Sequence, residues 1–219
     1  MNSELRTTSD GSHTLFVPEI DESYHSTHGA IQESRFIFID EALKLCKKKE
    51  ITILEIGFGT GLNAFLTLNE AETDNNQIHY ITLEKFPVPL EQAAQLNYSD
   101  IISPSKKGLF ELMHFWQWNQ PVQLTSQFIL EKIQVDFTTF NHSSYYDLVF
   151  FDAFSPEKQP EMWSQEQFEK IYAHCNPGAI LTTYCAKGVV RRALQNAGFE
   201  VERLAGPPGK REILRAIKR

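Results

Sequence analysis

The residues best suited to chemistry begin with a glycine-rich segment, Glu55-Ile-Gly-Phe-Gly-Thr-Gly61. It lies between Ile51–Ile56, which has the composition of a buried strand, and Leu62–Ala71, whose apolar residues have helical spacing. Glycine takes positive φ angles readily and lets backbone N–H groups come close to a ligand. Strand, glycine loop and helix in this order are typical of a nucleotide-binding unit. The ligand contacts expected from this segment are Glu55, Gly57, Gly59 and Gly61.

The loop suits S-adenosylmethionine (SAM) better than a dinucleotide. A dinucleotide fingerprint places a glycine at the sixth position, where this chain has Leu62. The pattern Gly-x-x-x-x-Gly-Lys-Ser/Thr does not occur, which excludes a P-loop. SAM carries no phosphate but has a sulfonium and an α-amino group, so an acid such as Glu55 favours its binding. The same carboxylate can equally be a structural group, buried and hydrogen-bonded to loop amides, and both interpretations stay open.

Two further acids follow predicted strands. Glu84 comes after Ile78–Leu83, where it can accept hydrogen bonds from both hydroxyls of a ribose, although it can also be an exposed acid at a strand end. Asp136 follows the strand Phe128–Val135 and can bind an adenine amino group, with Phe137 against the ring. Ligands of open α/β sheets bind outside the carboxyl ends of the strands, so these side chains are expected beside the glycine loop.

The main candidate for a catalytic group is Asp152. It comes directly after Tyr146–Phe151, a run too apolar for an edge strand. A residue at this position projects from the carboxyl end of the sheet into the crevice that holds ligands. The sequence Asp152-Ala-Phe-Ser-Pro156 also favours a turn, so a structural role for this acid is the alternative.

The elements that must position these residues repeat one pattern, a short apolar run followed by a helical stretch, which predicts an α/β sheet. Helices are expected at residues 40–49, 88–96, 109–118, 165–174 and 189–197. A strand is expected at Gly178–Tyr184. Phe199–Leu204 and Ile213–Ile217 follow each other without a helix, so they must be antiparallel. This finish resembles the sheet of Rossmann-like SAM methyltransferases, which implies a mostly parallel seven-stranded sheet with an antiparallel C-terminal hairpin.

Composition narrows the class of protein further. The length of 219 residues suits one globular domain. Cys46, Cys175 and Cys185 match neither a zinc pair nor a redox pair, and the seven histidines have no ligand spacing, so we expect no metal. The first ten residues are polar, and no apolar run reaches the ~18 residues of a spanning helix. We therefore expect a cytoplasmic protein that does not span a membrane.

Charge is distributed unevenly along the chain. The formal net charge is −7, yet the segment Lys187–Arg219 holds nine basic and three acidic residues. An acidic chain does not offer a whole surface to nucleic acid, but it can carry a local basic face. The basic tail is either a solvated surface or an edge that faces phosphates.

The segments just described resemble the MnmC-type methyltransferase family. The segments that carry the resemblance are Gly57-Phe-Gly-Thr-Gly-Leu-Asn63, Asp152-Ala-Phe-Ser-Pro-Glu-Lys-Gln-Pro-Glu-Met-Trp163, residues 188–199 with Gly209-Lys-Arg-Glu212, and the N-terminal Gly29-Ala-Ile-Gln-Glu-Ser-Arg-Phe-Ile-Phe38. The match covers most of the chain apart from roughly 86–130. It implies a SAM-dependent methyltransferase domain at 51–219 with an irregular insertion at about 99–127. Residues 1–50 are then an N-terminal extension that contributes to the substrate side.

The resemblance also implies an activity. Such domains make 5-methylaminomethyl-2-thiouridine at the wobble position of tRNA, which implies that this chain methylates the amino group of 5-aminomethyl-(2-thio)uridine. Asn63 would join the donor site, and Asp152 would orient the amine and help to remove its proton. Bifunctional members add an FAD-dependent oxidase. This chain has no second glycine fingerprint, so we expect no FAD here and a separate enzyme that supplies the aminomethyl group.

A tRNA substrate would give the basic tail its phosphates and the aromatic residues a base to stack on. The residues expected to face the anticodon loop or the base are Tyr24, Glu33, Phe154, Lys187, Arg191, Arg192, Lys210 and Arg211, with Trp163 and Tyr184 as further aromatic candidates. Two other functions fit the sequence. One is an N-methyltransferase or aminopropyl-type transferase that acts on a small amine or a protein. The other is a nucleotide-binding scaffold without activity.

Overall fold

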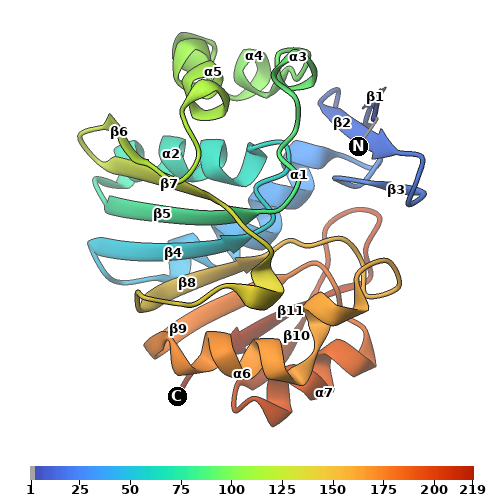
Figure 1. Cartoon of the computed structure of the whole chain (residues 1–219), viewed down its shortest axis with the longest axis vertical. Coiled ribbons are helices and arrows are strands. Elements are labelled where there is room, and N and C mark those ends of the chain that lie inside the picture. Colours follow the sequence, from blue (N-terminus) through green and yellow to red (C-terminus); the bar gives the residue numbers. More distant parts are fainter. Residues whose placement is uncertain (1–2) are drawn as a thin grey trace.

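The computed structural model describes residues 3–219 and is built around one eight-stranded sheet (Figure 1). Its strands lie in the order β10-β11-β9-β8-β4-β5-β7-β6. Their bounds are β4 Glu50–Ile56, β5 Gln77–Glu84, β6 Pro121–Thr125, β7 Phe128–Gln134, β8 Tyr146–Phe151, β9 Cys175–Thr183, β10 Glu200–Ala205 and β11 Glu212–Ile217. The α/β prediction is confirmed, and each predicted strand agrees with its sequence pattern to within a few residues.

The centre of the sheet is parallel. β4 pairs with β5 on one side and β8 on the other, β7 extends the sheet beyond β5, and β9 extends it beyond β8. All six residues of β8 are buried, because helices cover both faces of this strand. Ile56 and Phe151, the last residues of β4 and β8, are register partners. The glycine loop and Asp152 therefore leave the sheet side by side.

The two edges of the sheet contain its antiparallel strands. β11 lies between β9 and β10 and is antiparallel to both, which confirms the predicted C-terminal hairpin. At the other edge β6 pairs antiparallel with β7, so the predicted count of seven strands is one too low. β6 belongs to the segment assigned to the insertion, and only one of its five residues is buried. A short edge strand of this kind leaves little hydrophobic alternation in the sequence.

Helices cover both faces of the sheet (Figure 1). α2 (Leu62–Asp74) and α5 (Lys107–Phe115) pack on one face, while α6 (Gln165–Ala173) and α7 (Gly188–Asn196) pack on the other. Phe150 belongs to the first core cluster and its neighbour Phe151 to the second, as the period of two along a strand requires. No helix among residues 3–219 combines the length and the apolar character needed to cross a membrane.

The N-terminal segment lies beside the carboxyl ends of the central strands. It forms a small antiparallel sheet of β1 (Glu4–Thr7), β2 (His13–Val17) and β3 (Glu22–Ser23), followed by α1 (Ala30–Ser34) (Figure 1). Several contacts attach it to the rest of the chain, among them two hydrogen bonds to loops of the main sheet. His25 Nε2 lies 2.7 Å from Thr60 Oγ1, and the Ser155 backbone N–H donates to the Glu22 carboxylate at 3.2 Å.

Three predicted helices differ from the structure. In place of a helix at 40–49, the chain forms a π-helical turn at Arg35–Asp40 and a 3-10 turn at Leu43–Leu45. Ile37–Ile39 are buried consecutively, whereas a surface helix alternates apolar and polar faces, and Lys47–Lys49 have no apolar face to bury. The helix expected at 88–96 is reduced to α3, Leu90–Ala93. The insertion begins with α4, Tyr98–Ile102, and its predicted helix ends early, at Phe115 of α5.

Candidate active site

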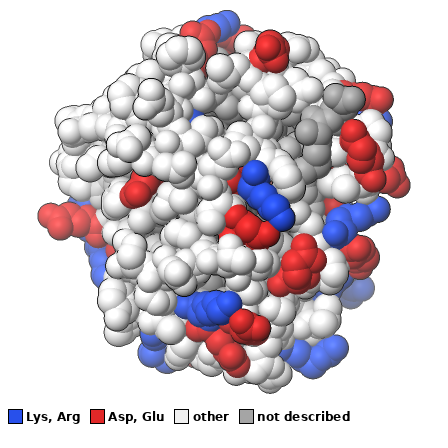
Figure 2. All heavy atoms as spheres, viewed as in Figure 1, with Lys and Arg blue, Asp and Glu red and all other residues white. Residues whose placement is uncertain are grey.

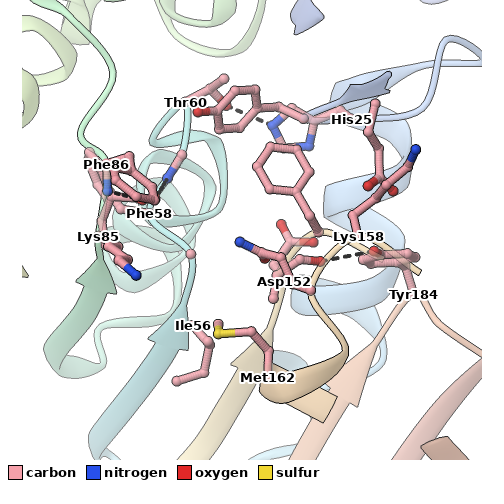
Figure 3. Close-up of a pocket in the computed structure, with 18 of the residues that line it drawn as sticks. His25, Ile56, Phe58, Thr60, Lys85, Phe86, Asp152, Lys158, Met162 and Tyr184 are labelled. Carbon is pink, nitrogen blue, oxygen red and sulfur yellow. Dashed lines mark hydrogen bonds between the residues drawn. The ribbon is translucent and has the colours of Figure 1, made fainter. Parts of the chain in front are cut away.

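A cavity of about 530 Å³ opens at the carboxyl ends of β4, β5 and β8. Figure 3 shows Lys85 and Phe86 on one side of it, with Asp152, Lys158 and Tyr184 on the other. Of the sequence-predicted residues, those that line the cavity are Tyr24, Glu33, Gly57, Gly59, Asn63, Glu84, Asp136, Phe137, Asp152, Phe154, Tyr184 and Lys210. The crevice expected at the strand ends is therefore present, and most of the candidate residues meet in it.

The glycine loop has no room for side chains at two positions. Gly57 has a φ of 95°, and a Cβ there would lie 2.7 Å from the Asp152 carbonyl oxygen. Gly59 has a φ of 50°, and a Cβ there would lie 2.8 Å from Cδ1 of Tyr24. The loop thus passes between the Asp152 corner and the N-terminal segment, which explains why glycine is needed. Gly61 lies at the start of α2 and does not line the cavity.

Glu84 connects the end of β5 to this loop. Its Oε2 accepts a hydrogen bond from the Gly59 N–H at 3.1 Å, and its Oε1 accepts one from the Phe86 N–H at 2.8 Å. Burial raises the pKa of this carboxyl, and the two backbone donors oppose that change. Each oxygen retains a further acceptor position, so Glu84 can receive hydroxyl groups from a ligand in the cavity.

Asp136 follows β7, the strand paired with β5, so it lies near Glu84, and it is held by its neighbours. Lys85 Nζ donates to its Oδ2 at 2.8 Å, and the Thr138 N–H donates to its Oδ1 at 2.9 Å. The hydrogen bond from Lys85, together with those from Thr138, lowers the pKa of Asp136 to about 2. Asp136 caps a 3-10 turn, and Phe137 in that turn is buried with its surface toward the cavity. Asp136 is therefore an ionised wall residue at neutral pH.

Asp152 lies on the cavity floor, where β8 ends. Its backbone N–H donates to the Ile56 carbonyl at 3.0 Å, and its Oδ2 accepts from Asn63 Nδ2 at 2.8 Å. Burial raises the pKa of Asp152 to about 7. The hydrogen bond from Asn63 and the charge of Lys210 lower this pKa, and the charge of Glu33 raises it. A carboxyl poised near neutral pH is suited to proton transfer.

Glu55 does not reach the cavity. It is fully buried beneath the loop, where its Oε2 accepts from Thr82 Oγ1 at 2.6 Å. Burial raises its pKa to about 8. The direct ligand contact expected of Glu55 does not fit this position, because its side chain does not line the cavity. Of the two interpretations of its sequence position, the structure favours a buried structural group, although its partner is a threonine and not a loop amide.

The end of the cavity around Lys210 is formed by groups that are far apart in the sequence. Glu33 from α1 and Lys210 from the β10–β11 loop are 3.8 Å apart, between Oε1 and Nζ. Lys210 Nζ also lies 4.6 Å from the ring centroid of Tyr184, whose hydroxyl donates to the Ala153 carbonyl. Burial raises the pKa of Glu33, and Lys210 opposes this change. Lys210 and the carboxyls of Glu33 and Asp152 thus face this end of the cavity.

The aromatic candidates divide between the cavity and the core. Tyr24 and Phe154 both line the cavity and pack edge to face, with ring centroids 5.0 Å apart. Trp163 is buried, donates from Nε1 to the Phe154 carbonyl and packs on Phe151, so it is core and not a stacking surface. Tyr24, Phe154 and Tyr184 remain available to a planar ligand.

The other basic candidates lie outside the cavity. Lys187 pairs with Glu157, while Arg192 and Arg211 are exposed and Arg191 is half-buried. On the face in Figure 2, basic and acidic side chains are interspersed and do not form one basic surface. Among residues 3–219 no group of three His, Cys, Asp or Glu side chains is arranged to hold a metal ion.

Several lining residues were missed by the sequence reasoning. They are His25, Phe58, Thr60, Lys85, Phe86 and Lys158. Phe58 and Thr60 lie within the glycine segment, and Lys85 and Phe86 follow Glu84, so adjacency to a motif was the available signal. His25 follows Tyr24, and Lys158 lies within the segment Asp152–Trp163, so adjacency was the available signal for them as well.

The chain is similar to known proteins in sequence. Residues 112–219 match the family described as S-adenosyl-L-methionine-dependent methyltransferase. The chain is 31% identical to the tRNA 5-methylaminomethyl-2-thiouridine biosynthesis bifunctional protein MnmC of Idiomarina loihiensis, over 89% of this chain and 35% of that protein. Identity to the protein of the same name from Marinomonas sp. is 32%, over 89% and 31%. The chain spans about a third of the length of these curated relatives.

Solved structures share the fold. MNMC2 from Aquifex aeolicus has a TM-score of 0.80 and 27% identity, and the match covers 98% of this chain and 70% of that chain. Spermidine synthase from Thermotoga maritima has a TM-score of 0.59 at 10% identity and covers 100% and 72%, which is a likeness of fold alone.

Proposed function

Since the chain belongs to the family of the MnmC methyltransferase domain, we propose that it methylates the amino group of 5-aminomethyl-(2-thio)uridine at the wobble position of tRNA, with SAM as the donor. The product is 5-methylaminomethyl-(2-thio)uridine. The observation that carries this proposal is the position of Asp152, which adjoins the glycine loop, lines the cavity and has a pKa near neutrality.

The cavity residues fit a sulfonium nucleoside donor. Gly57 and Gly59 let the loop pack against Asp152 and Tyr24, where a Cβ would clash. Glu84 offers acceptors for ribose hydroxyls. Phe137 provides an apolar surface for an adenine, and Asp136 provides an acceptor at the same wall. No phosphate-binding group is required on this side. Donor binding is assigned to these residues together with Asn63.

The chemistry requires a free amine lone pair. A lysine-like amine has a reference pKa of about 10.4, so it enters the site mainly as an ammonium ion. The donor supplies an electrophilic methyl group, so a nitrogen–carbon bond forms while the methyl–sulfur bond breaks. Asn63 engages Oδ2 of Asp152, which leaves Oδ1 to hold the ammonium and take one of its protons. The resulting neutral Asp152 returns that proton to solvent.

Residues outside the donor site are assigned to the substrate. The extension, residues 1–50, supplies Tyr24 and Glu33, and Phe154 completes an aromatic surface for a base displaced from the anticodon loop. Lys187, Arg191, Arg192, Lys210 and Arg211 are assigned to tRNA phosphates. A separate enzyme supplies the aminomethyl group, and the reaction takes place in the cytoplasm, where tRNA is found.

The test is transfer of label from methyl-labelled SAM. The protein is mixed with tRNA that lacks the final methyl group and, in parallel, with small alkyl amines. We expect label in tRNA and none in the small amines. Label only in small amines would support a general N-methyltransferase, and failure to bind SAM would support an inactive scaffold. Either result contradicts the proposal.

A further inference from the structure

A buried polar cluster lies directly behind Asp152. It consists of Glu55 on β4, Asn63 on α2, and Tyr80 and Thr82 on β5. Glu55, Tyr80 and Thr82 are 0% exposed and Asn63 is 2% exposed. Polar groups at this depth are normally all hydrogen-bonded, because an unpaired one loses its interaction with water. An unpartnered atom in this cluster therefore indicates which group carries a proton.

The cluster is incompletely satisfied when Glu55 is ionised. Thr82 Oγ1 donates to Glu55 Oε2 at 2.6 Å, and Asn63 Nδ2 donates to Asp152 Oδ2 at 2.8 Å. Glu55 Oε1, Asn63 Oδ1 and the Tyr80 hydroxyl have no partner. Glu55 Oε1 and Asn63 Oδ1 are both acceptors while Glu55 is a carboxylate, and the Tyr80 hydroxyl is the one donor among the three atoms. It can donate to only one of the two acceptors, so the other still lacks a donor.

One proton on Glu55 removes this deficit. A neutral carboxyl at Glu55 gains an O–H donor, and the unpartnered Asn63 Oδ1 is its matching acceptor. Burial raises the pKa of Glu55 to about 8, with a smaller increase from the charge of Asp152, although hydrogen bonds from Thr82, Asn63 and Tyr80 lower it. A proton on Glu55 at neutral pH therefore agrees with the pattern of unpartnered atoms.

We propose that Glu55 is a positioning residue, which as a neutral acid fixes the Asn63 amide so that its NH₂ group faces Asp152 and keeps that carboxylate ionised. This inference rests on the proposed function, because it explains how Asp152 stays ready to accept the proton of the amine. In the flipped amide, the NH₂ group faces an ionised Glu55, and the amide oxygen requires a proton on Asp152. That arrangement leaves Asp152 unable to accept another proton.

The groups that face the two carboxyls are few. Asp152 is faced by Glu33 from α1, Lys210 from the β10–β11 loop and Tyr184 after β9, and Glu55 is faced by Tyr80 from β5 and by Asp152 itself. A substitution at Glu55 leaves these groups in place. Loss of an ionised Glu55 would by its charge alone lower the pKa of Asp152 and move the acid limb to lower pH, so a shift to higher pH in such a variant reports on the connection through Asn63.

The kinetic test compares Glu55→Ala with Glu55→Gln, and Glu50→Gln at the exposed start of the same strand is the matched control. The alanine variant frees Asn63 to flip, so kcat falls about tenfold or more and the acid limb of its pH profile moves to higher pH. Glutamine can donate to Asn63 Oδ1 and accept from Thr82, so it restores most of kcat and the wild-type limb. The amine is the same in every assay, so its own titration cancels.

Two measurements on Glu55→Gln do not depend on turnover. The Kd for SAM is expected within about twofold of the wild-type value, whereas an anionic Glu55 that binds the donor predicts a clear loss of affinity. The infrared difference spectrum, wild type minus Glu55→Gln at pH 7, is expected to contain the C=O band of a protonated carboxyl. The band of an ionised carboxylate, or weakened SAM binding, would overturn the proposal. If the wild type methylates no tRNA, the proposed function fails, and the infrared band still decides the state of Glu55.

Discussion

The two sides of the cavity are built in different ways. The side that we assign to the donor, called the donor side, is formed by the glycine loop with Glu84, Asp136 and Phe137, each placed within a few residues of the end of a parallel strand. The side that we assign to the substrate, called the substrate side, is formed by Tyr24 and Glu33 from the N-terminal segment, Phe154 from the loop after β8, and Lys210 from the C-terminal hairpin. The position of each residue on the first side is set by the strand that precedes it, within one repeated βα unit. The second side forms only when the two ends of the chain have folded onto the sheet.

This difference predicts a separation of functions. Changes on the donor side should alter SAM affinity, while changes on the substrate side should alter the amine and tRNA steps. Asp152 lies between the two sides, in contact with Asn63 on one and influenced by Glu33 and Lys210 on the other. Its substitution should therefore affect turnover more than either binding step.

The largest effect is expected for Asp152→Asn. The amide cannot accept the proton of the ammonium, so kcat should fall about 10²-fold or more. The Kd for SAM, measured by isothermal titration calorimetry, should remain nearly unchanged, because the side chain keeps its size and its place beside Asn63. Unaltered turnover would remove Asp152 from the mechanism.

On the donor side, Glu84→Ala should raise the Kd for SAM about tenfold or more, since it removes charged acceptors and leaves the Gly59 and Phe86 N–H groups without partners. At saturating SAM, kcat should change much less. Glu91→Ala, an exposed acid on α3, is the control. A loss confined to kcat would show that the two sides are not separable at this residue.

On the substrate side, two substitutions should shift the pH profile in opposite directions. Asp152 must be ionised to accept a proton, so the rate should rise with pH through its pKa of about 7. The charge of Glu33 raises this pKa and that of Lys210 lowers it. Glu33→Gln should therefore move the acid limb of kcat to lower pH, and Lys210→Met should move it to higher pH, by up to about one pH unit. Shifts in the same direction would contradict the assigned arrangement.

The smallest effect is expected outside the cavity. Arg192→Glu combined with Arg211→Glu should weaken tRNA binding several-fold and flatten its dependence on salt, by about one unit of slope for each lost phosphate contact. Lys47→Glu combined with Lys170→Glu changes the net charge equally and is the control. Equal losses in both double variants would mean that net charge alone governs binding.

The donor side could be predicted from sequence because its residues follow strands with strong patterns. β8 is buried at all six positions, so Asp152 was assigned correctly to a strand end, and Glu84 follows an equally clear run. The same dependence on pattern explains why β6 was missed. An exposed edge strand has few buried residues, so its sequence pattern is hard to distinguish from that of a loop.

The substrate side could not be derived in the same way. Glu33 and Lys210 lie together in the structure although 177 positions separate them in the sequence. They became candidates only because the segments that contain them resemble a known family. The helix predicted at 40–49 failed because a cluster of lysines near a helix end does not make a helix without an apolar face. The orientation of Glu55 could not be predicted either. An acid that precedes a glycine loop can point toward the ligand or away from it, and the sequence pattern is the same in both cases.

The most direct test of the central claim is nucleoside mass spectrometry of tRNA from cells that lack this protein, with the wild type or Asp152→Asn restored. We predict that the unmethylated 5-aminomethyl nucleoside accumulates without the protein, is converted to the methylaminomethyl form by the wild type, and persists with Asp152→Asn. An unchanged nucleoside profile after loss of the protein, or full conversion by Asp152→Asn, would contradict the account.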